Sequence, residues 1–203
     1  MSEIKAIIFD IGGVLDKGKW EEHYAPLCNE FGIRLEDFDK PYKKYFKEAT
    51  IGKISTNEFM KSVGKEINVN PKKLLEVWVK TKKKVLLEDE EVRKIIIKLK
   101  KKGYKVASLT NIIELHHKMR IEKNLYNLFE FNICSCVEGV CKPHMKIYAL
   151  LLNKLKGILP NQIIFVDNKE EYLVPARKFG IKTILFKNAN QLTDELKKLG
   201  VMV

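Results

Sequence analysis

The feature that most constrains the fold is an alternation of short apolar runs with segments of helical periodicity. The first run, Ile4 to Phe9, is followed by a long stretch (19–84) whose apolar residues recur at helical spacing, and four further runs come after it. These later runs are 105–109, 129–134, 162–166 and 181–186. Helices are expected between and after them, at 88–102, 112–123, 143–156, 170–179 and 190–199. This alternation predicts a parallel sheet that helices cover on both faces.

The predicted fold is therefore an α/β domain with a doubly wound, parallel five-stranded sheet, formed by residues 1–17 and 88–203. The remaining residues, 18–87, form an insertion placed just after the first strand. We expect four helices there, because no β-branched run interrupts the helical spacing. Ser55 and Glu58 have the capping-box spacing at the start of one helix, and Pro71 suits the first turn of another.

Composition supports a globular protein with a substantial core. Hydrophobic residues make up 45% of the 203 residues and charged residues 32%. No apolar run approaches the roughly 20 residues that cross a bilayer, and the N-terminus lacks the pattern of a signal peptide. We therefore expect a cytoplasmic protein without membrane association, whose four cysteines are free thiols.

The net charge of +12, from 38 basic and 26 acidic residues, suggests an acidic partner. Neither the insertion nor the rest of the chain contains a dedicated basic arm, and only four basic residues are arginine. Because arginine dominates base readout and bidentate phosphate binding, this distribution argues against nucleic acid as the main partner. A lysine-coated surface and a small phosphorylated ligand are the alternatives it favours.

Polar residues follow the predicted strands at the edge where parallel sheets bind ligands. Each of them could also serve only as a helix cap. Several at successive strand ends, beside an insertion placed to cover them, instead favour a binding site. They are Asp10, Thr110, Asn111, Lys142 with Pro143, Asp167 and Asn168.

Four short segments at these positions resemble the motifs of the haloacid dehalogenase-like hydrolases. They are 9–15 (FDIGGVL), 108–111 (SLTN), 142–143 (KP) and 165–168 (FVDN), and their order and spacing span the whole chain. Within the superfamily the chain looks most like the branch of glucose-1-phosphatase-like enzymes and the N-terminal domain of soluble epoxide hydrolases. The resemblance implies a Rossmann-like core with a small helical cap after the first strand.

The resemblance also implies a nucleophile and a metal. Asp10 would attack phosphorus and form an aspartyl-phosphate, and Mg²⁺ would be held by Asp10, the carbonyl of Gly12 and Asp167. A carboxylate can attack an anionic substrate only if a cation shields it, which agrees with a metal at this position.

The same resemblance assigns the contacts of the phosphoryl group. Thr110 and Asn111 would donate hydrogen bonds to its oxygens, and Lys142 would neutralise charge on the phosphate and on the nucleophile. Gly12 and Gly13 would allow a sharp turn that aims backbone amides at these oxygens.

One departure from the family concerns proton transfer. Most phosphatases of the superfamily carry a second Asp two residues after the nucleophile, which protonates the leaving alcohol and later activates water. Here that position is Gly12. Asp16 is a nearby substitute, although a role in capping or solvating the turn into the insertion fits its position better. A substrate whose leaving group needs little protonation, such as a sugar-1-phosphate or an acyl phosphate, would suit such a site.

A second departure concerns the metal. Asn168 stands where the family usually has a second Asp, which removes one negative charge from the surroundings of the cation. Glu171 stands where several branches place a further acid and could restore that charge; the alternative is a surface Glu at a helix start. We expect weaker Mg²⁺ binding than in relatives with two acids.

These features favour a Mg²⁺-dependent phosphatase of a small phosphorylated metabolite, which could be a sugar phosphate, acting as a monomer or homodimer. The alternative is a weakly active or inactive relative that binds a phosphorylated ligand or a protein. Haloacid dehalogenation needs no metal and would leave Asp167 an unneeded buried acid.

Two further groups of residues have competing interpretations. Cys134, Cys136, Cys141 and His144 resemble a loose zinc site, but their spacing departs from the usual paired cysteines, and Cys134 and Cys136 would alternate on a strand facing the core. His116 could face the cap and contact substrate, although a partly buried histidine with its hydrogen bonds satisfied is the simpler interpretation.

Overall fold

The computed structural model describes residues 3–17, 20–85 and 87–203 and contains a parallel five-stranded sheet. The strands are β1 (Ala6–Phe9), β2 (Lys105–Thr110), β3 (Asn132–Cys134), β4 (Ile163–Asp167) and β5 (Lys182–Leu185). Their order across the sheet is β3-β2-β1-β4-β5, and Phe9 at the end of β1 pairs with Ser108 on one side and Val166 on the other. The predicted α/β fold and its doubly wound sheet are confirmed.

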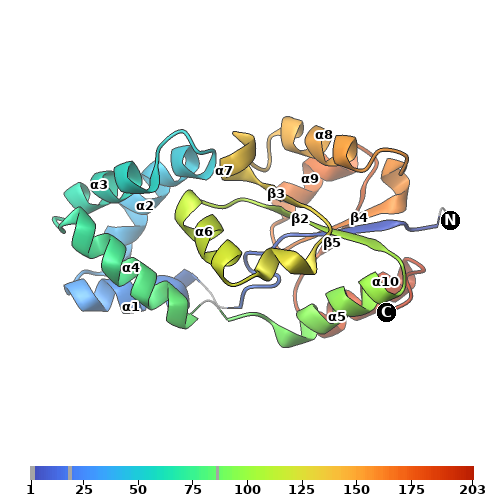
Figure 1. Cartoon of the computed structure of the whole chain (residues 1–203), viewed down its shortest axis with the longest axis horizontal. Coiled ribbons are helices and arrows are strands. Elements are labelled where there is room, and N and C mark those ends of the chain that lie inside the picture. The colour runs from blue at the N-terminus through green and yellow to red at the C-terminus, as the bar shows by residue number, and fades with distance from the viewer. Residues whose placement is uncertain (1–2, 18–19, 86) are drawn as a thin grey trace.

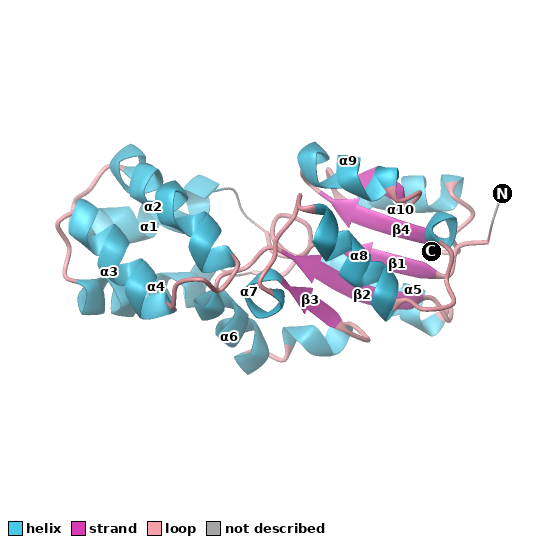
Figure 2. Ribbon diagram, turned by 90° about the horizontal axis from the view of Figure 1, so that it is seen from above, coloured by secondary structure: helices cyan, strands magenta, loops and turns pink. Residues whose placement is uncertain are grey.

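Helices cover both faces of the sheet because side chains of the buried strands alternate between two apolar clusters. Ile7 and Phe9 face the cluster formed with α5 (Glu90–Lys101) and α10 (Ala189–Lys198). Ala6 and Ile8 face the cluster formed with α8 (Met145–Lys154) and α9 (Glu170–Lys178). Figure 2 shows all the labelled strands pointing the same way, toward the helices of the insertion.

The third strand is shorter than expected. Residues 129–134 were predicted as strand, but a 3-10 turn, η1 (Leu125–Leu128), precedes them and β3 contains only Asn132–Cys134. A one-turn helix, α7 (Ser135–Glu138), follows at once, because the Ser135 hydroxyl binds the backbone of Ile112, accepting from its N–H at 2.9 Å. Cys136 therefore lies in α7, and the expected alternation of Cys134 and Cys136 on a strand was wrong.

Two helices begin later than their sequence patterns suggested. The helix expected at 112–123 is α6 (Glu114–Glu122), and the helix expected at 143–156 is α8, whose N-cap is His144. The Nδ1 atom of His144 accepts a hydrogen bond from the backbone N–H of Lys146, which satisfies one free donor of the first turn. A short 3-10 turn, η2 (Pro160–Gln162), leads into β4.

The insertion consists of four helices that share an apolar cluster of their own. They are α1 (Trp20–Phe31), α2 (Leu35–Thr50), α3 (Thr56–Glu66) and α4 (Pro71–Val85), and Figure 1 shows them beside the sheet. Phe38, Phe59 and Trp78 are buried at the centre of this cluster. The expected capping box is present: Ser55 accepts from the backbone N–H of Glu58, and the Glu58 carboxylate accepts from that of Ser55. We call α1–α4 the helical block.

The chain enters and leaves the helical block through two adjacent segments. The N–H of Lys17 donates to the carbonyl of Leu87 at 2.8 Å, and the N–H of Asp89 donates to the carbonyl of Leu15 at 2.7 Å. A second contact ties the block to α6: the Glu114 carboxylate accepts from the N–H and hydroxyl of Thr56. These contacts place the block over the carboxyl ends of the strands.

Within the described ranges, no helix combines the length and apolar character that crossing a bilayer requires.

Candidate active site

Three charged side chains meet at the carboxyl edge of the sheet. Asp10 follows β1, Asp167 is the last residue of β4, and Lys142 lies in the segment between α7 and α8. The ammonium of Lys142 is 3.1 Å from Asp10 Oδ1 and 2.6 Å from Asp167 Oδ2. β1 and β4 are neighbours at the point where the strand order reverses, which is where ligands bind in sheets of this kind.

Lys142 is held in this position by groups on both sides. Its side chain is 0% exposed, and its ammonium lies 5.3 Å from the ring centre of Phe165 and 5.0 Å from that of Tyr172. The side chain of Asn111 binds the backbone of Lys142 twice, accepting from its N–H and donating to its carbonyl, both at 2.8 Å. Asn111 thus positions the lysine, and its expected contact with a phosphoryl oxygen stays a prediction.

The electrostatics of this cluster favour a further cation. Burial raises the pKa of Asp167 to about 6, and the nearby charge of Asp10 adds to the shift, while Lys142 opposes it. Two carboxylates therefore share one ammonium, which leaves an excess negative charge in a buried place. Carboxylate oxygens of this kind suit Mg²⁺, which protein sites commonly hold through one or two carboxylates and several waters.

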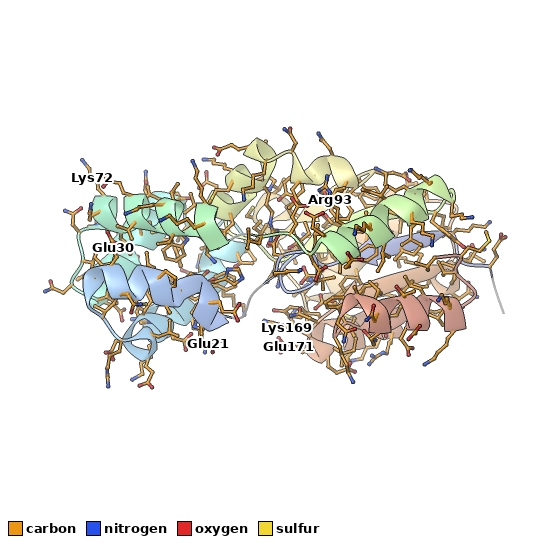
Figure 3. All side chains as sticks on the ribbon, turned by 90° about the horizontal axis from the view of Figure 1, so that it is seen from below. Glu21, Glu30, Lys72, Arg93, Lys169 and Glu171 are labelled. Carbon is orange, nitrogen blue, oxygen red and sulfur yellow. The ribbon has the colours of Figure 1, made fainter. Side chains whose placement is uncertain are left out.

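The other two side chains predicted to bind the metal, Asn168 and Glu171, do not lie in the buried cluster. Asn168 and Glu171 are both exposed, and Figure 3 labels Glu171 with Lys169 at the start of α9. Across the described parts of the chain, no group of three or more His, Cys, Asp or Glu side chains is arranged to hold a metal, and this includes the cysteines near His144. Asp10 and Asp167 are thus the acidic side chains of the cluster that fit a cation, and the expected contribution of the Gly12 carbonyl stays a prediction.

The two glycines after Asp10 differ in what surrounds them. Gly13 has φ +78°, a backbone conformation that favours glycine. A Cβ there would lie 2.3 Å from Asn168 Nδ2, so the exposed side chain of Asn168 would have to move. At Gly12 a Cβ would meet no atom within 4 Å. The position where the family carries an acid is therefore empty, and a larger side chain would have room.

Arg120 is a site residue that the sequence did not reveal. This residue of α6 is 7% exposed; it forms an ion pair with Asp16, which is 5% exposed, and donates to the Thr110 hydroxyl at 3.3 Å. The expected capping or solvated role of Asp16 was therefore wrong, because the guanidinium pairs with it inside the protein. One available signal was that arginine is rare in this lysine-rich chain, and arginine is preferred for buried ion pairs.

A cavity of about 300 Å³ separates the sheet edge from the helical block. Gly12, Gly13 and Asn111 line it on the sheet side, and Trp20 and Phe46 on the block side. His116 also lines it, and its Nε2 accepts a hydrogen bond from the indole N–H of Trp78 at 3.0 Å. The ring is therefore partly buried and satisfied at Nε2, as the simpler interpretation expected, and its contact with substrate stays a prediction.

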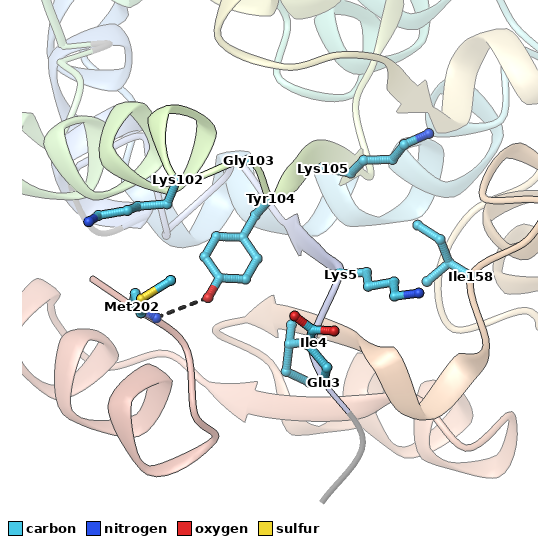
Figure 4. A pocket seen from close by; sticks show the side chains of 9 residues that line it. All are labelled: Glu3, Ile4, Lys5, Lys102, Gly103, Tyr104, Lys105, Ile158 and Met202. Atoms are coloured by element: carbon cyan, nitrogen blue, oxygen red, sulfur yellow. Dashed lines mark hydrogen bonds between the residues drawn. The ribbon is translucent and has the colours of Figure 1, made fainter.

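A second hollow lies at the opposite, amino end of the strands (Figure 4). Ile4, Lys105 and Ile158 line it, and the hydroxyl of Tyr104 accepts a hydrogen bond from the N–H of Met202 at 3.0 Å. It lies away from the Asp10–Lys142–Asp167 cluster, so we place the candidate site at the carboxyl edge.

Comparison with known families agrees with this geometry. The family model described as haloacid dehalogenase-like hydrolase matches residues 4–180, a range that contains every residue of the cluster. The chain belongs to the haloacid dehalogenase-like hydrolases. The curated proteins that it is similar to include a phosphatase and a bifunctional epoxide hydrolase.

Two curated proteins and one solved structure illustrate what the chain is similar to. Glyceraldehyde 3-phosphate phosphatase of Pyrococcus furiosus is 32% identical, over 92% of this chain and 82% of that protein. Bifunctional epoxide hydrolase 2 of Sus scrofa is 25% identical, and the match covers 97% of this chain but 39% of that longer protein. The magnesium complex of a HAD family enzyme from Bacteroides thetaiotaomicron has the same fold, with a TM-score of 0.76 and 23% identity, covering 92% of this chain and 94% of that one.

Proposed function

We propose that this hydrolase is a Mg²⁺-dependent phosphatase that acts on a small phosphorylated metabolite through an aspartyl-phosphate. The observation that carries the proposal is the placement of Lys142 between Asp10 and Asp167 at the sheet edge. The name of the Pyrococcus relative, a phosphatase of a sugar phosphate, supports the same reaction class.

In the proposed reaction, the Asp10 carboxylate attacks phosphorus and the bond from phosphorus to the leaving oxygen breaks. Water then attacks the phosphorus of the aspartyl-phosphate, which releases inorganic phosphate and restores the carboxylate. Lys142 neutralises charge on Asp10 and on the phosphoryl group during both displacements. Mg²⁺, held by Asp10, Asp167 and the Gly12 carbonyl, would supply the positive charge that lets two anions approach.

Arg120 orients the Thr110 hydroxyl so that it can donate a hydrogen bond to the phosphoryl group. Because the guanidinium donates to Thr110 Oγ1, the hydroxyl proton is directed elsewhere and can be donated to a phosphoryl oxygen. Gly12 offers no acid for the leaving group, so we expect the rate to depend steeply on leaving-group acidity. A general acid usually contributes about 10²–10⁴-fold.

A panel of phosphomonoesters assayed with Mg²⁺, with Asp10→Asn as the control, tests the proposal. We expect hydrolysis by the natural protein, faster for aryl than for simple alkyl phosphates, and none by the variant. Absence of hydrolysis across the panel would refute the phosphatase. The missing acid at Gly12 favours one alternative, a phosphate-binding protein without turnover. Beryllofluoride separates the two, because the enzyme should bind it at Asp10 in the presence of Mg²⁺ and gain thermal stability.

A further inference from the structure

The cavity between the sheet edge and the helical block contains basic nitrogen atoms that the proposed phosphoryl chemistry does not use. Lys82 of α4 lines it and is 4% exposed, and its ammonium lies 4.0 Å from the ring centre of Tyr24. Among the described residues, no carboxylate lies within ion-pair distance of this ammonium. A buried ammonium without a counter-ion is costly, so its retention calls for an explanation.

Two other nitrogen atoms of the same lining lack a hydrogen-bond partner in the described part of the chain. His23 Nδ1 and Arg120 Nε are buried, and neither forms a hydrogen bond within the described ranges. They come from α1 and α6, so three separate helices direct basic side chains to one cavity. Unsatisfied buried polar atoms are uncommon in folded proteins. Two of them in the lining of one cavity, beside a buried ammonium for which no ion pair is seen among the described residues, indicate a missing ligand.

The charged residues that line the cavity indicate whether the missing ligand is an anion or a cation. Asp16 is the one acid among its described lining residues, and Arg120 already pairs with it. Burial lowers the pKa of Lys82 to about 7, and Asp16, although it opposes this shift, does not cancel it. An anion beside Lys82 would restore the charged ammonium and fill the free positions on His23 and Arg120.

We infer that Lys82, His23 and Arg120 bind a second anionic group, a carboxylate or a second phosphate, on the part of the substrate that leaves. This inference rests on the proposed phosphatase function and deepens it, because it names the class of substrate. The reacting phosphoryl group lies at Asp10, Thr110 and Lys142, and the second anion lies toward the helical block, next to the aromatic side chains of Trp20 and Tyr24.

Two synthetic substrates with the same ring test the inference. 4-Carboxyphenyl phosphate carries the second anion, and 4-carbamoylphenyl phosphate replaces it with a neutral group of similar shape. We expect kcat/KM to favour the carboxylate about tenfold in the natural protein, as a charge-assisted hydrogen bond would give. Lys82→Met should reduce this preference to less than about twofold. 1,4-Phenylene bisphosphate, compared with the same neutral substrate, shows whether a phosphate is preferred over a carboxylate.

Lys83→Met is the matched control, because Lys83 is the next residue of α4 and is exposed, and it should keep the tenfold preference. Because the two leaving phenols differ in acidity, the decisive quantity is the change in the kcat/KM ratio between the natural protein and the variant. A ratio that Lys82→Met leaves unchanged would overturn the inference and leave the phosphatase intact.

Calorimetry on Asp10→Asn measures binding without turnover. If the natural protein hydrolyses neither compound but Asp10→Asn binds the carboxylate about tenfold more tightly, the phosphatase fails and the anion subsite stands. Equal or undetectable binding of both compounds refutes the subsite.

Discussion

Arg120 and Asp16 form a buried ion pair although 104 residues separate them in the sequence. The pair joins α6 to the turn through which the chain enters the helical block, and Arg120 continues the contact to Thr110. Desolvating two charges is costly, so the pair gives Asp16 a partner rather than adding much net stability. Its second effect is to fix a hydroxyl beside the proposed phosphoryl site.

Replacing Arg120 with Met should strongly destabilise the protein, because Asp16 would stay buried without a counter-ion. We expect a loss of about 3–5 kcal/mol in the free energy of unfolding, measured by urea denaturation. Arg177→Met is the control: its pair with Glu170 is exposed, so the loss should stay below about 1 kcal/mol. Adding Asp16→Asn to Arg120→Met should recover part of the stability. A double variant as unstable as the sum of the two singles would contradict this account.

Replacing Asp167 with Asn should stabilise the metal-free protein at high pH. The folded-state pKa of about 6 lies above the ordinary value of 3.8. The charged carboxylate therefore lowers the free energy of unfolding, and this loss is complete above pH 6. That cost disappears as the pH falls toward 3.8 and the group is protonated in both states. Thermal unfolding with EDTA should therefore show a higher Tm for the variant at pH 8 and a smaller difference at pH 5.

With Mg²⁺ the order should reverse, because we expect the natural protein to gain stability from metal binding and Asp167→Asn to gain none. The apparent Mg²⁺ affinity of the natural protein should also weaken below pH 6, where protons compete for Asp167. Equal stabilisation of both proteins by Mg²⁺ would remove Asp167 from the proposed ligand set.

Replacing Gly12 with Asp should restore the missing general acid. A side chain at this position starts in open space, whereas Gly13→Asp would strain a backbone with φ +78° and displace the Asn168 side chain. We expect Gly12→Asp to raise kcat for simple alkyl phosphates by about 10²-fold, with a smaller gain for aryl phosphates, whose leaving groups need less protonation. Gly13→Asp should lose activity. An unchanged ratio of alkyl to aryl rates in Gly12→Asp would show that proton donation is not what limits the natural protein.

Replacing Lys82 with Met should stabilise the protein, since it removes a buried ammonium for which the described residues provide no ion-pair partner. The folded-state pKa of about 7 lies below the ordinary 10.5, so the cost of the charge is complete below pH 7 and vanishes as the pH rises to 10.5. We expect a Tm about 5 °C higher at pH 6, with a gain that shrinks toward pH 10. A gain independent of pH would mean that packing, and not charge, explains it.

Such a gain would mean that the natural residue sacrifices stability, as residues kept for binding commonly do. The charged cluster at the sheet edge also reduces stability, because Asp10, Lys142 and Asp167 lie close together in a buried place. The stability lost at Lys82 and at the Asp10–Lys142–Asp167 cluster is consistent with selection for ligand binding.

The sequence by itself determined the α/β fold and the gathering of Asp10, Lys142 and Asp167. Alternating strands and helices leave few topologies, and parallel strands bring their carboxyl ends to one edge, so residues that follow strands meet there. It could not determine where β3 ends, since the contact of Ser135 with Ile112 decides this. Local propensity contains no information about such a contact.

Only the tertiary structure decided which charged residues face the cavity. Lys82 is one of several lysines at the end of α4, and Arg120 is one of the basic residues of α6; helical periodicity does not say which of them becomes buried. Burial depends on how the helical block packs over the sheet edge, and this packing brings together residues far apart in the chain. That arrangement pairs Arg120 with Asp16 and leaves Lys82 without an ion pair to any carboxylate of the described residues.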